Sequence, residues 1–177
     1  MRWNWIDKFI DMVDGESAVA IKTWTMAEDH LHDLQPDFPI VPHALIVEGM
    51  AQTAGLLIGA ARDYKEKVVL AKVGKAVFHR LVRPGDTILF YAKVDQFNDA
   101  GASITGHVTF GNAASAKVRQ TVSDPGPGDD LVAEIELMFS HVDQNMGGIK
   151  FPEHNFVFEN TFKRLVDDFR VGNALKI

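Results

Sequence analysis

Glu48 and Gln52 interrupt an otherwise apolar segment that runs from residue 44 to residue 60. In a helix, side chains four residues apart lie on one face, one turn from each other. Burying a carboxyl group among apolar neighbours costs free energy, and burial favours the protonated form of the group. We therefore predict that Glu48 donates a proton in a reaction. Gln52 either orients this carboxyl group or makes a purely structural hydrogen bond.

Three histidines precede or begin the same segment. His43 stands directly before it, where the positive end of a helix would keep an imidazole neutral and able to act as a base. A solvent-facing histidine at a helix start is an equally good interpretation. His30 and His32 are more simply exposed loop residues, although a shifted loop could bring in His32, or less readily His30, to supply the imidazole. The two offer too few ligands for a metal site, so we predict no metal.

Prolines recur at every third position before this segment, at Pro36, Pro39 and Pro42. Each proline restricts the backbone and removes a hydrogen-bond donor, so we predict a stiffened extended loop over residues 30–42. The apolar segment that follows predicts a helix over residues 44–63, and its apolar character almost all round predicts burial. Its uninterrupted apolar part is short for a bilayer, so we expect no membrane span.

Alternating apolar and polar residues predict strands before and after this helix. A turn at Asp14-Gly15 joins two segments that we expect to form a hairpin. The pair Pro84-Gly85 is typical of a type II turn. The predicted strands and the final amphipathic helix cover residues 17–25, 68–82, 87–94, 102–110, 131–142 and 160–171. One apolar helix among antiparallel strands predicts an α+β domain in which the sheet curls around the helix.

Composition narrows the possible functions. The 177 residues fit one domain. A formal net charge of -6 argues against a nucleic-acid partner, because phosphate binding needs a basic surface. The absence of cysteine excludes disulfides, thiolate nucleophiles and cysteine-bound metals. We see no signal peptide and expect a cytoplasmic protein.

Residues 34–52 resemble the signature of the beta-hydroxyacyl-[acyl carrier protein] dehydratases, which reads H-F-P-G-x-P-x-(M/V)-P-G-x-L-x-x-(E/D)-x-x-x-Q. The match needs no gap. It places the three prolines, the leucine, the acid and the glutamine at Pro36, Pro39, Pro42, Leu45, Glu48 and Gln52. The likeness extends over roughly residues 5–142.

This chain departs from the signature at four positions. Leu34 stands where the family has its histidine, and Gln35 replaces the phenylalanine. Asp37 and His43 replace the two glycines. Leucine cannot transfer a proton, so the family's mechanism cannot be copied onto this sequence without another base.

The resemblance implies a hot-dog fold, in which an antiparallel sheet wraps one long buried helix. We expect a hot-dog domain over residues 1–150 and a C-terminal helical extension over residues 151–177, packed on or beside it. In the family, a histidine base and an acid from opposite subunits of a dimer face the substrate. Backbone N–H groups near the helix start polarise the thioester carbonyl, a role that falls here to Ala44. We expect Pro42, Phe38 and Gln52 to contact substrate as well.

The leading prediction is a dehydratase of beta-hydroxyacyl thioesters carried on acyl carrier protein or coenzyme A, in fatty-acid or related lipid metabolism. Glu48 would be the acid, with His43 or His32 as the base, without a cofactor. We expect a homodimer or an oligomer of dimers. One alternative is a non-catalytic acyl-thioester-binding protein, which Leu34 favours. Another is a hot-dog thioesterase, in which the helix carboxylate activates water.

Overall fold

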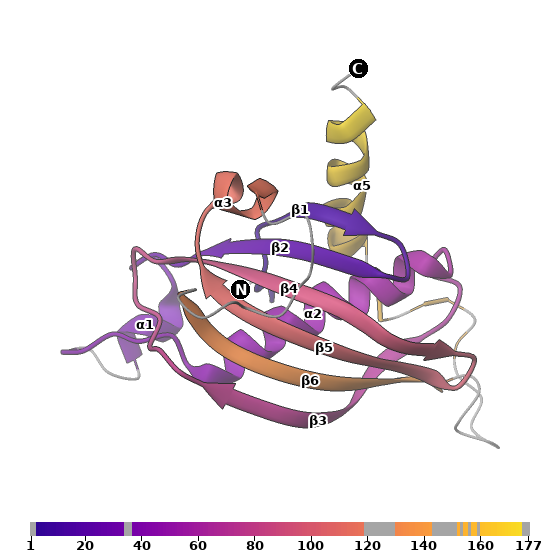
Figure 1. The fold of residues 1–177 in the computed structure, drawn as a ribbon, viewed down its shortest axis with the longest axis horizontal. Coiled ribbons are helices and arrows are strands. Elements are labelled where there is room, and N and C mark those ends of the chain that lie inside the picture. Colours follow the sequence, from indigo (N-terminus) through magenta and orange to yellow (C-terminus); the bar gives the residue numbers. More distant parts are fainter. Residues whose placement is uncertain are drawn as a thin grey trace.

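The computed structural model describes residues 3–33, 37–118, 130–142, 152, 154–155, 157–158 and 160–174. Within these residues the strands form one antiparallel sheet in the order β1-β2-β4-β5-β6-β3 (Figure 1). The strands are β1 Lys8–Val13, β2 Ser17–Thr23, β3 Val68–Phe78, β4 Thr87–Asn98, β5 Gly101–Phe110 and β6 Leu131–His141. The predicted antiparallel sheet is thus confirmed, and its edge strands are β1 and β3.

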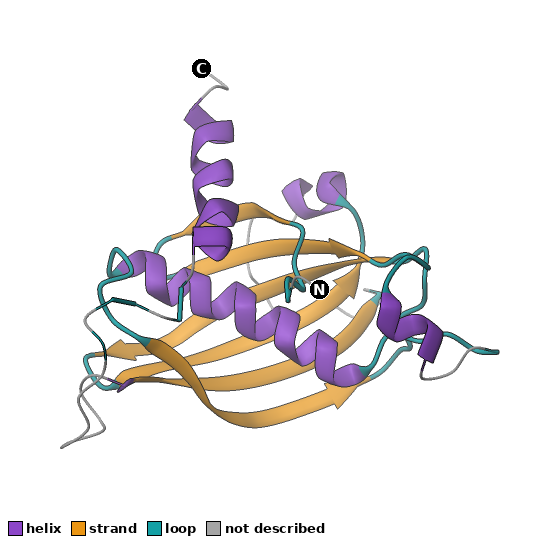
Figure 2. Cartoon of the chain, turned by 180° about the vertical axis from the view of Figure 1, so that it is seen from behind, coloured by secondary structure: helices purple, strands orange, loops and turns teal. Residues whose placement is uncertain are grey.

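The predicted buried helix is α2, His43–Ala61, which lies across the concave face of the sheet (Figure 2). In the described part of the chain, α2 is the one helix long and apolar enough to cross a bilayer. In this fold, however, 72% of that stretch is buried in the protein. Its apolar residues therefore serve as the core that the sheet wraps around.

Close packing against α2 depends on Gly49. A Cβ atom at this position would lie 2.5 Å from Cζ of Phe90 on β4 and 3.0 Å from the main-chain oxygen of Trp5. A contact of 2.5 Å essentially does not occur for real side chains, so a larger residue at position 49 would displace the Phe90 ring and press on the backbone of Trp5. The N-terminal segment is consequently held against the face of α2 that carries Glu48 and Gln52.

Two turns have the geometry that their residue types predict. Gly15, between β1 and β2, has a φ of 73°, and Gly85 has a φ of 97°. The N–H of Asp86 donates to the main-chain oxygen of Arg83 at 3.0 Å, which closes the Pro84-Gly85 turn. Glycine adopts positive φ without steric cost, which is why these sequences form turns here.

The expected loop over residues 30–42 is wrong at its beginning. A short helix, α1 Asp29–Asp33, occupies that part of the chain. Proline restricts its own backbone and that of the residue before it, so Pro36 leaves residues 29–33 free to form a helical turn. A second short helix, α3 Ala113–Val118, was also not predicted.

The strand expected over residues 68–82 is shorter than predicted, because β3 ends at Phe78. Beyond it, the main-chain oxygen of Val82 accepts a hydrogen bond from the N–H of Val41 at 2.8 Å. The chain therefore leaves the sheet to pair with the segment that leads into α2.

The predicted C-terminal amphipathic helix is α5, Asn160–Ala174 (Figure 1, yellow). Val166 on this helix is fully buried and belongs to the main core. Arg170 forms an ion pair with Asp14 at the end of the β1–β2 hairpin. The helix thus contacts both the core and the hairpin, while the division of the chain at residue 150 stays a prediction.

Candidate active site

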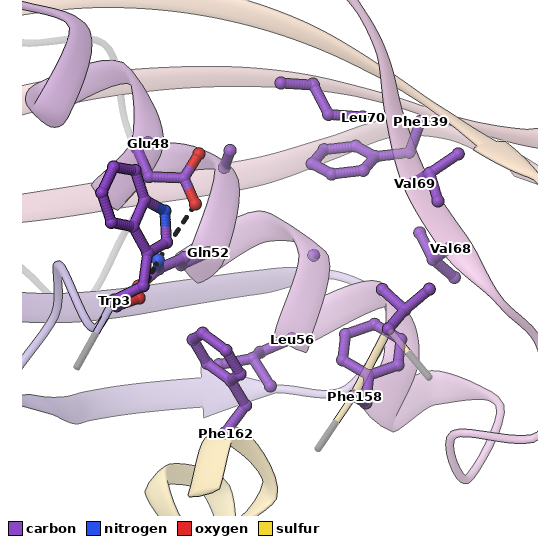
Figure 3. A pocket seen from close by; sticks show the side chains of 13 residues that line it. Trp3, Glu48, Gln52, Leu56, Val68, Val69, Leu70, Phe139, Phe158 and Phe162 are labelled. Carbon is purple, nitrogen blue, oxygen red and sulfur yellow. Dashed lines mark hydrogen bonds between the residues drawn. The ribbon is translucent and has the colours of Figure 1, made fainter. Parts of the chain in front are cut away.

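A pocket of about 310 Å³ opens beside the middle of α2 (Figure 3). Its walls come from the N-terminal segment, α2, the start of β3, β6 and the C-terminal segment. The lining residues are Trp3, Glu48, Ala51, Gln52, Gly55, Leu56, Val68, Val69, Leu70, Phe139, Val157, Phe158 and Phe162. Glu48 and Gln52 supply the polar side chains of this lining, and most of the remainder is apolar. A pocket of this kind buries an apolar ligand and orients it by one polar end.

Gln52 joins Glu48 to the N-terminal segment. Its Nε2 donates to Oε1 of Glu48 at 3.0 Å and to the main-chain oxygen of Trp3 at 2.9 Å. Its Oε1 accepts from the N–H of Trp5 at 2.8 Å. Gln52 is only 8% exposed, so these bonds form largely out of water. The two roles considered for this residue, a structural hydrogen bond and contact with the carboxyl group, are therefore present together.

Glu48 is half-buried rather than enclosed. One turn of α2 separates it from Gln52, as their spacing predicts, and its carboxyl group points towards the pocket (Figure 3). The hydrogen bond from Gln52 restricts the side chain, since an amide donor one turn away fixes one carboxyl oxygen. The carboxyl group is thus positioned at one end of an apolar pocket, where it can exchange a proton with a bound molecule.

His43 lies outside this pocket lining. It begins α2, as expected, but its side chain is exposed and its ring stacks on Phe78, with 4.0 Å between ring centroids and 3° between planes. Within one chain, the structure therefore does not bring His43 together with Glu48.

The other expected substrate contacts also lie away from the pocket. Pro42 is the N-cap of α2 and is half-buried, and Ala44 lies exposed in the first helical turn. Phe38 is 45% exposed, and the guanidinium carbon of Arg83 lies 3.9 Å from its ring centroid. All three are near the start of α2, whereas the pocket opens further along the helix.

The remaining histidine candidates, His32 and His30, differ in what the structure describes of them. His32 belongs to α1, but its side chain is outside the described residues, as is the whole of Leu34. The ring of His30 meets those of Trp5 and Trp24 edge-on, at centroid distances of 5.1 and 5.7 Å. Burial there lowers the pKa of His30 below its ordinary value of 6.5. His30 does not line the pocket.

The described part of the chain contains no evident metal-binding site. No group of three or more His, Asp or Glu side chains there is close enough to hold a metal ion. The arrangement is that of a carboxyl group beside an apolar pocket, and such a group is able to exchange a proton with a bound molecule.

Sequence reasoning missed the apolar walls of the pocket. Phe162 was expected on the apolar face of the last helix, but nothing in the sequence linked it to Glu48. Phe139 and Phe158 likewise come close to α2 only through the fold. Local patterns identify apolar faces, but they do not identify which faces meet.

Comparison with known proteins identifies the family of this chain. Residues 4–109 match the FabA-like domain family. A 3-hydroxyacyl-[acyl-carrier-protein] dehydratase FabZ of Listeria welshimeri is 33% identical over 136 residues, which cover 76% of this chain and 83% of that protein.

Solved structures resemble the fold. An uncharacterized protein of Pyrococcus horikoshii has a TM-score of 0.56 at 15% identity, over 82% of this chain and 90% of that chain. The dehydratase heterocomplex ApeI:P of Xenorhabdus doucetiae has a TM-score of 0.52 at 12% identity, over 73% of this chain and 92% of that chain. At such low identity these structures bear on fold alone. Together with the family match, they show that this chain has the hot-dog fold and belongs to the FabA-like family, alongside the FabZ-type dehydratases.

Proposed function

We propose that this chain is a hydro-lyase that dehydrates beta-hydroxyacyl thioesters carried on acyl carrier protein or coenzyme A. The observation that carries the proposal is the carboxyl group of Glu48, held by Gln52 at the polar end of an apolar pocket. An acyl chain fits the apolar walls, and its reacting carbons would then lie beside the acid. The similarity to FabZ-type dehydratases supports the same reaction.

In the proposed reaction, a base removes a proton from the carbon next to the thioester carbonyl. The electron pair forms a double bond to the next carbon, whose bond to the hydroxyl oxygen breaks. Glu48 gives its proton to that oxygen, which leaves as water. In this proposal the thioester lies over the first turn of α2, outside the pocket lining, where the N–H of Ala44 would stabilise the negative charge on the carbonyl oxygen. Proton exchange with solvent restores Glu48 and the base.

We infer that a second copy of this chain completes the site. Strand β3 is an edge of the sheet, and Leu70, Val73 and Val77 on it are 37–41% exposed. Unpaired edges with exposed apolar side chains favour pairing with another strand. Because Val68 and Leu70 also line the pocket, a copy added at β3 would lie beside Glu48. His43 or His32 of that second copy is then our candidate for the base.

A turnover assay tests the reaction and separates it from its rivals. The purified chain is given beta-hydroxyacyl thioesters of acyl carrier protein and of coenzyme A, and enoyl formation, thiol release and binding are measured. Enoyl formation supports the dehydratase. Thiol release without enoyl product supports a thioesterase. Binding without either product supports the non-catalytic binder, which Leu34 in place of the family's histidine favours. The cytoplasmic location stays a prediction.

The base is identified by comparing two variants. His43→Gly abolishes enoyl formation if His43 is the base, and leaves it intact or improved if His32 is. His32→Ala has the opposite pattern. If both variants keep wild-type turnover, neither histidine is the base.

The dimer is tested with Val73→Glu, because a charge on an exposed edge strand opposes pairing. We expect sedimentation at micromolar concentration to give a dimer for the wild type and a monomer for the variant, which also loses turnover. Val171→Glu is the matched control, since Val171 is 58% exposed on α5, away from this edge. A wild-type monomer would contradict the shared site.

A further inference from the structure

The C-terminal segment contributes one wall of the pocket. Val157, Phe158 and Phe162 all line it, although they lie beyond residues 4–109, which match the FabA-like family. Phe162 and Leu56 are drawn next to each other, and Phe158 lies on the side away from Glu48 (Figure 3). This wall is therefore specific to the part of the chain that follows the last strand.

Asn155 attaches this wall to the loop between α2 and β3. Its Nδ2 donates to the main-chain oxygens of Tyr64 and Glu66, each at 2.9 Å. Its Oδ1 accepts from the N–H of Val157 at 3.1 Å and of Phe158 at 3.3 Å. One amide side chain thus fixes the backbone directly at two of the three residues that enter the pocket wall.

Phe158 occupies a gap that α2 leaves open at Gly59. A Cβ atom on Gly59 would lie 2.7 Å from Cζ of Phe158, so any larger residue would displace the ring. The Tyr64 ring meets Phe158 edge-on, with 5.2 Å between centroids. Phe158 is only 6% exposed. Its ring is enclosed on several sides and acts as a fixed wall.

Helix α5 holds Phe162 beside the same pocket. Val166, one turn further along, is fully buried in the core. The ammonium group of Lys163 lies 5.3 Å from the Tyr64 ring centroid. With the ion pair from Arg170, these contacts fix α5 along its length.

We propose that the C-terminal segment sets the greatest acyl-chain length that the pocket accepts. Phe158 closes the end of the pocket that lies farthest from Glu48. The inference rests on the proposed function for the placement of the reacting carbons beside Glu48. From Glu48 to Leu56, the last α2 residue in the lining, the helix rises ~12 Å at ~1.5 Å per residue. An extended acyl chain advances ~1.3 Å per carbon, the projection of C–C bonds of ~1.5 Å, so about eight to ten carbons fit.

The size of the pocket points to the same substrate class. Its volume of about 310 Å³ is near the lower end of ligand pockets, which range over ~300–1,000 Å³. The structure thus assigns short- and medium-chain acyl thioesters to this site, with longer chains excluded by the aromatic wall.

The test compares Phe158→Leu with Phe169→Ala across thioesters that differ only in acyl length. Phe169 lies on α5 and packs on the core, but it does not line the pocket, so it is a control for a general disturbance of the helix. In the wild type, each added carbon should tighten binding about fourfold until the pocket is full, after which binding weakens. Phe158→Leu should move this limit about one carbon longer, because the leucine side chain ends roughly 1.8 Å short of the tip of the phenylalanine ring. Phe169→Ala should leave the limit unchanged.

Two readouts separate this inference from the proposed reaction. One is kcat/KM for enoyl formation, and the other is binding of unreactive acyl thioether analogues. If Phe158→Leu shifts the acyl-length limit for binding but the protein has no turnover, Phe158 still limits the acyl length and the proposed dehydratase reaction is contradicted. If folded Phe158→Leu turns over substrate with an unchanged acyl-length limit, Phe158 does not set that limit. An equal shift of the limit in Phe169→Ala would also contradict the role of Phe158, and neither outcome would contradict the dehydratase reaction. Gly55→Ala is a second, fold-compatible variant, because its Cβ would meet Phe139 at an ordinary 3.5 Å. Because Gly55 lines the pocket, Gly55→Ala should lower the greatest acyl length that binds.

Discussion

The two ends of the pocket are built in different ways. At the polar end, Glu48 and Gln52 lie one turn apart on α2, and Gln52 bonds to the backbone of Trp3 and Trp5. At the apolar end, the walls come from α2, β3, β6 and the C-terminal segment, which meet only in the fold. The polar side chains of the pocket are therefore concentrated in one short helical segment, whereas its apolar walls come from several elements distant in sequence.

This difference predicts different consequences of mutation. A change at the polar end alters the reaction for every acyl length, because the same acid serves each substrate. A change at the apolar end alters which lengths fit and leaves the chemistry of those that still fit intact. Phe158→Leu tests the second statement, and the variants below test the first and the connection between the two ends.

The largest effect is expected for Glu48→Gln. The amide keeps the shape and can still bond to Gln52, but it cannot donate a carboxyl proton. Loss of acid catalysis costs ~10²–10⁴-fold in rate, so kcat should fall by this factor at every acyl length. Glu16→Gln, an exposed residue in the β1–β2 turn, is the matched control. Turnover within about threefold of wild type, well short of that range, would remove Glu48 as the acid.

Gln52→Leu should destabilise the polar end. It leaves the buried N–H of Trp5 without its acceptor and the oxygen of Trp3 without its donor. An unpaired buried group costs about 1–3 kcal/mol, so the free energy of unfolding in urea should fall by this amount. Gln96→Leu changes an exposed glutamine and should have little effect. Equal stability of the two variants would show that the Gln52 bonds contribute nothing to the fold.

Asn155→Asp loosens the apolar end. Aspartate still accepts from Val157 and Phe158, but as a carboxylate it no longer donates to Tyr64 and Glu66. At about 1 kcal/mol for each lost hydrogen bond, we expect a modest loss of stability and faster proteolysis of the C-terminal segment. The acyl-length limit should become less sharp while kcat for short chains stays near wild type. A fall in kcat at all lengths would mean that the two ends are not independent.

The smallest effect concerns pH and His30. Burial against Trp5 and Trp24 is the main cause that lowers the pKa of His30 below 6.5, while Glu28 opposes the shift. The unfolded chain thus binds the proton more readily, so this contribution to stability is full above pH 6.5 and declines as the pH falls below it. His30→Phe should make the free energy of unfolding less dependent on pH between about pH 7 and pH 5. An unchanged pH dependence would contradict this assignment.

Much of the fold follows from local sequence. The apolar stretch after Pro42 gives α2, and the positive φ that glycine permits gives the turns at Gly15 and Gly85. The spacing of Glu48 and Gln52 places both on one helical face. The short helix at residues 29–33 was missed because the proline pattern was applied beyond the residues that proline restricts.

The sequence by itself determined the family resemblance, the buried helix with its acid and amide one turn apart, and the loss of the usual histidine at Leu34. Those features depend on residue type and helical spacing, which act over a few residues. Tertiary structure alone decided that the Trp5 N–H and the Trp3 oxygen bind Gln52, that His43 stacks on Phe78 away from the pocket, and that Phe158 fills the gap at Gly59. Such contacts join residues far apart in the chain. They form because the sheet, α2 and α5 pack closely, and close packing restricts each of these side chains to one position.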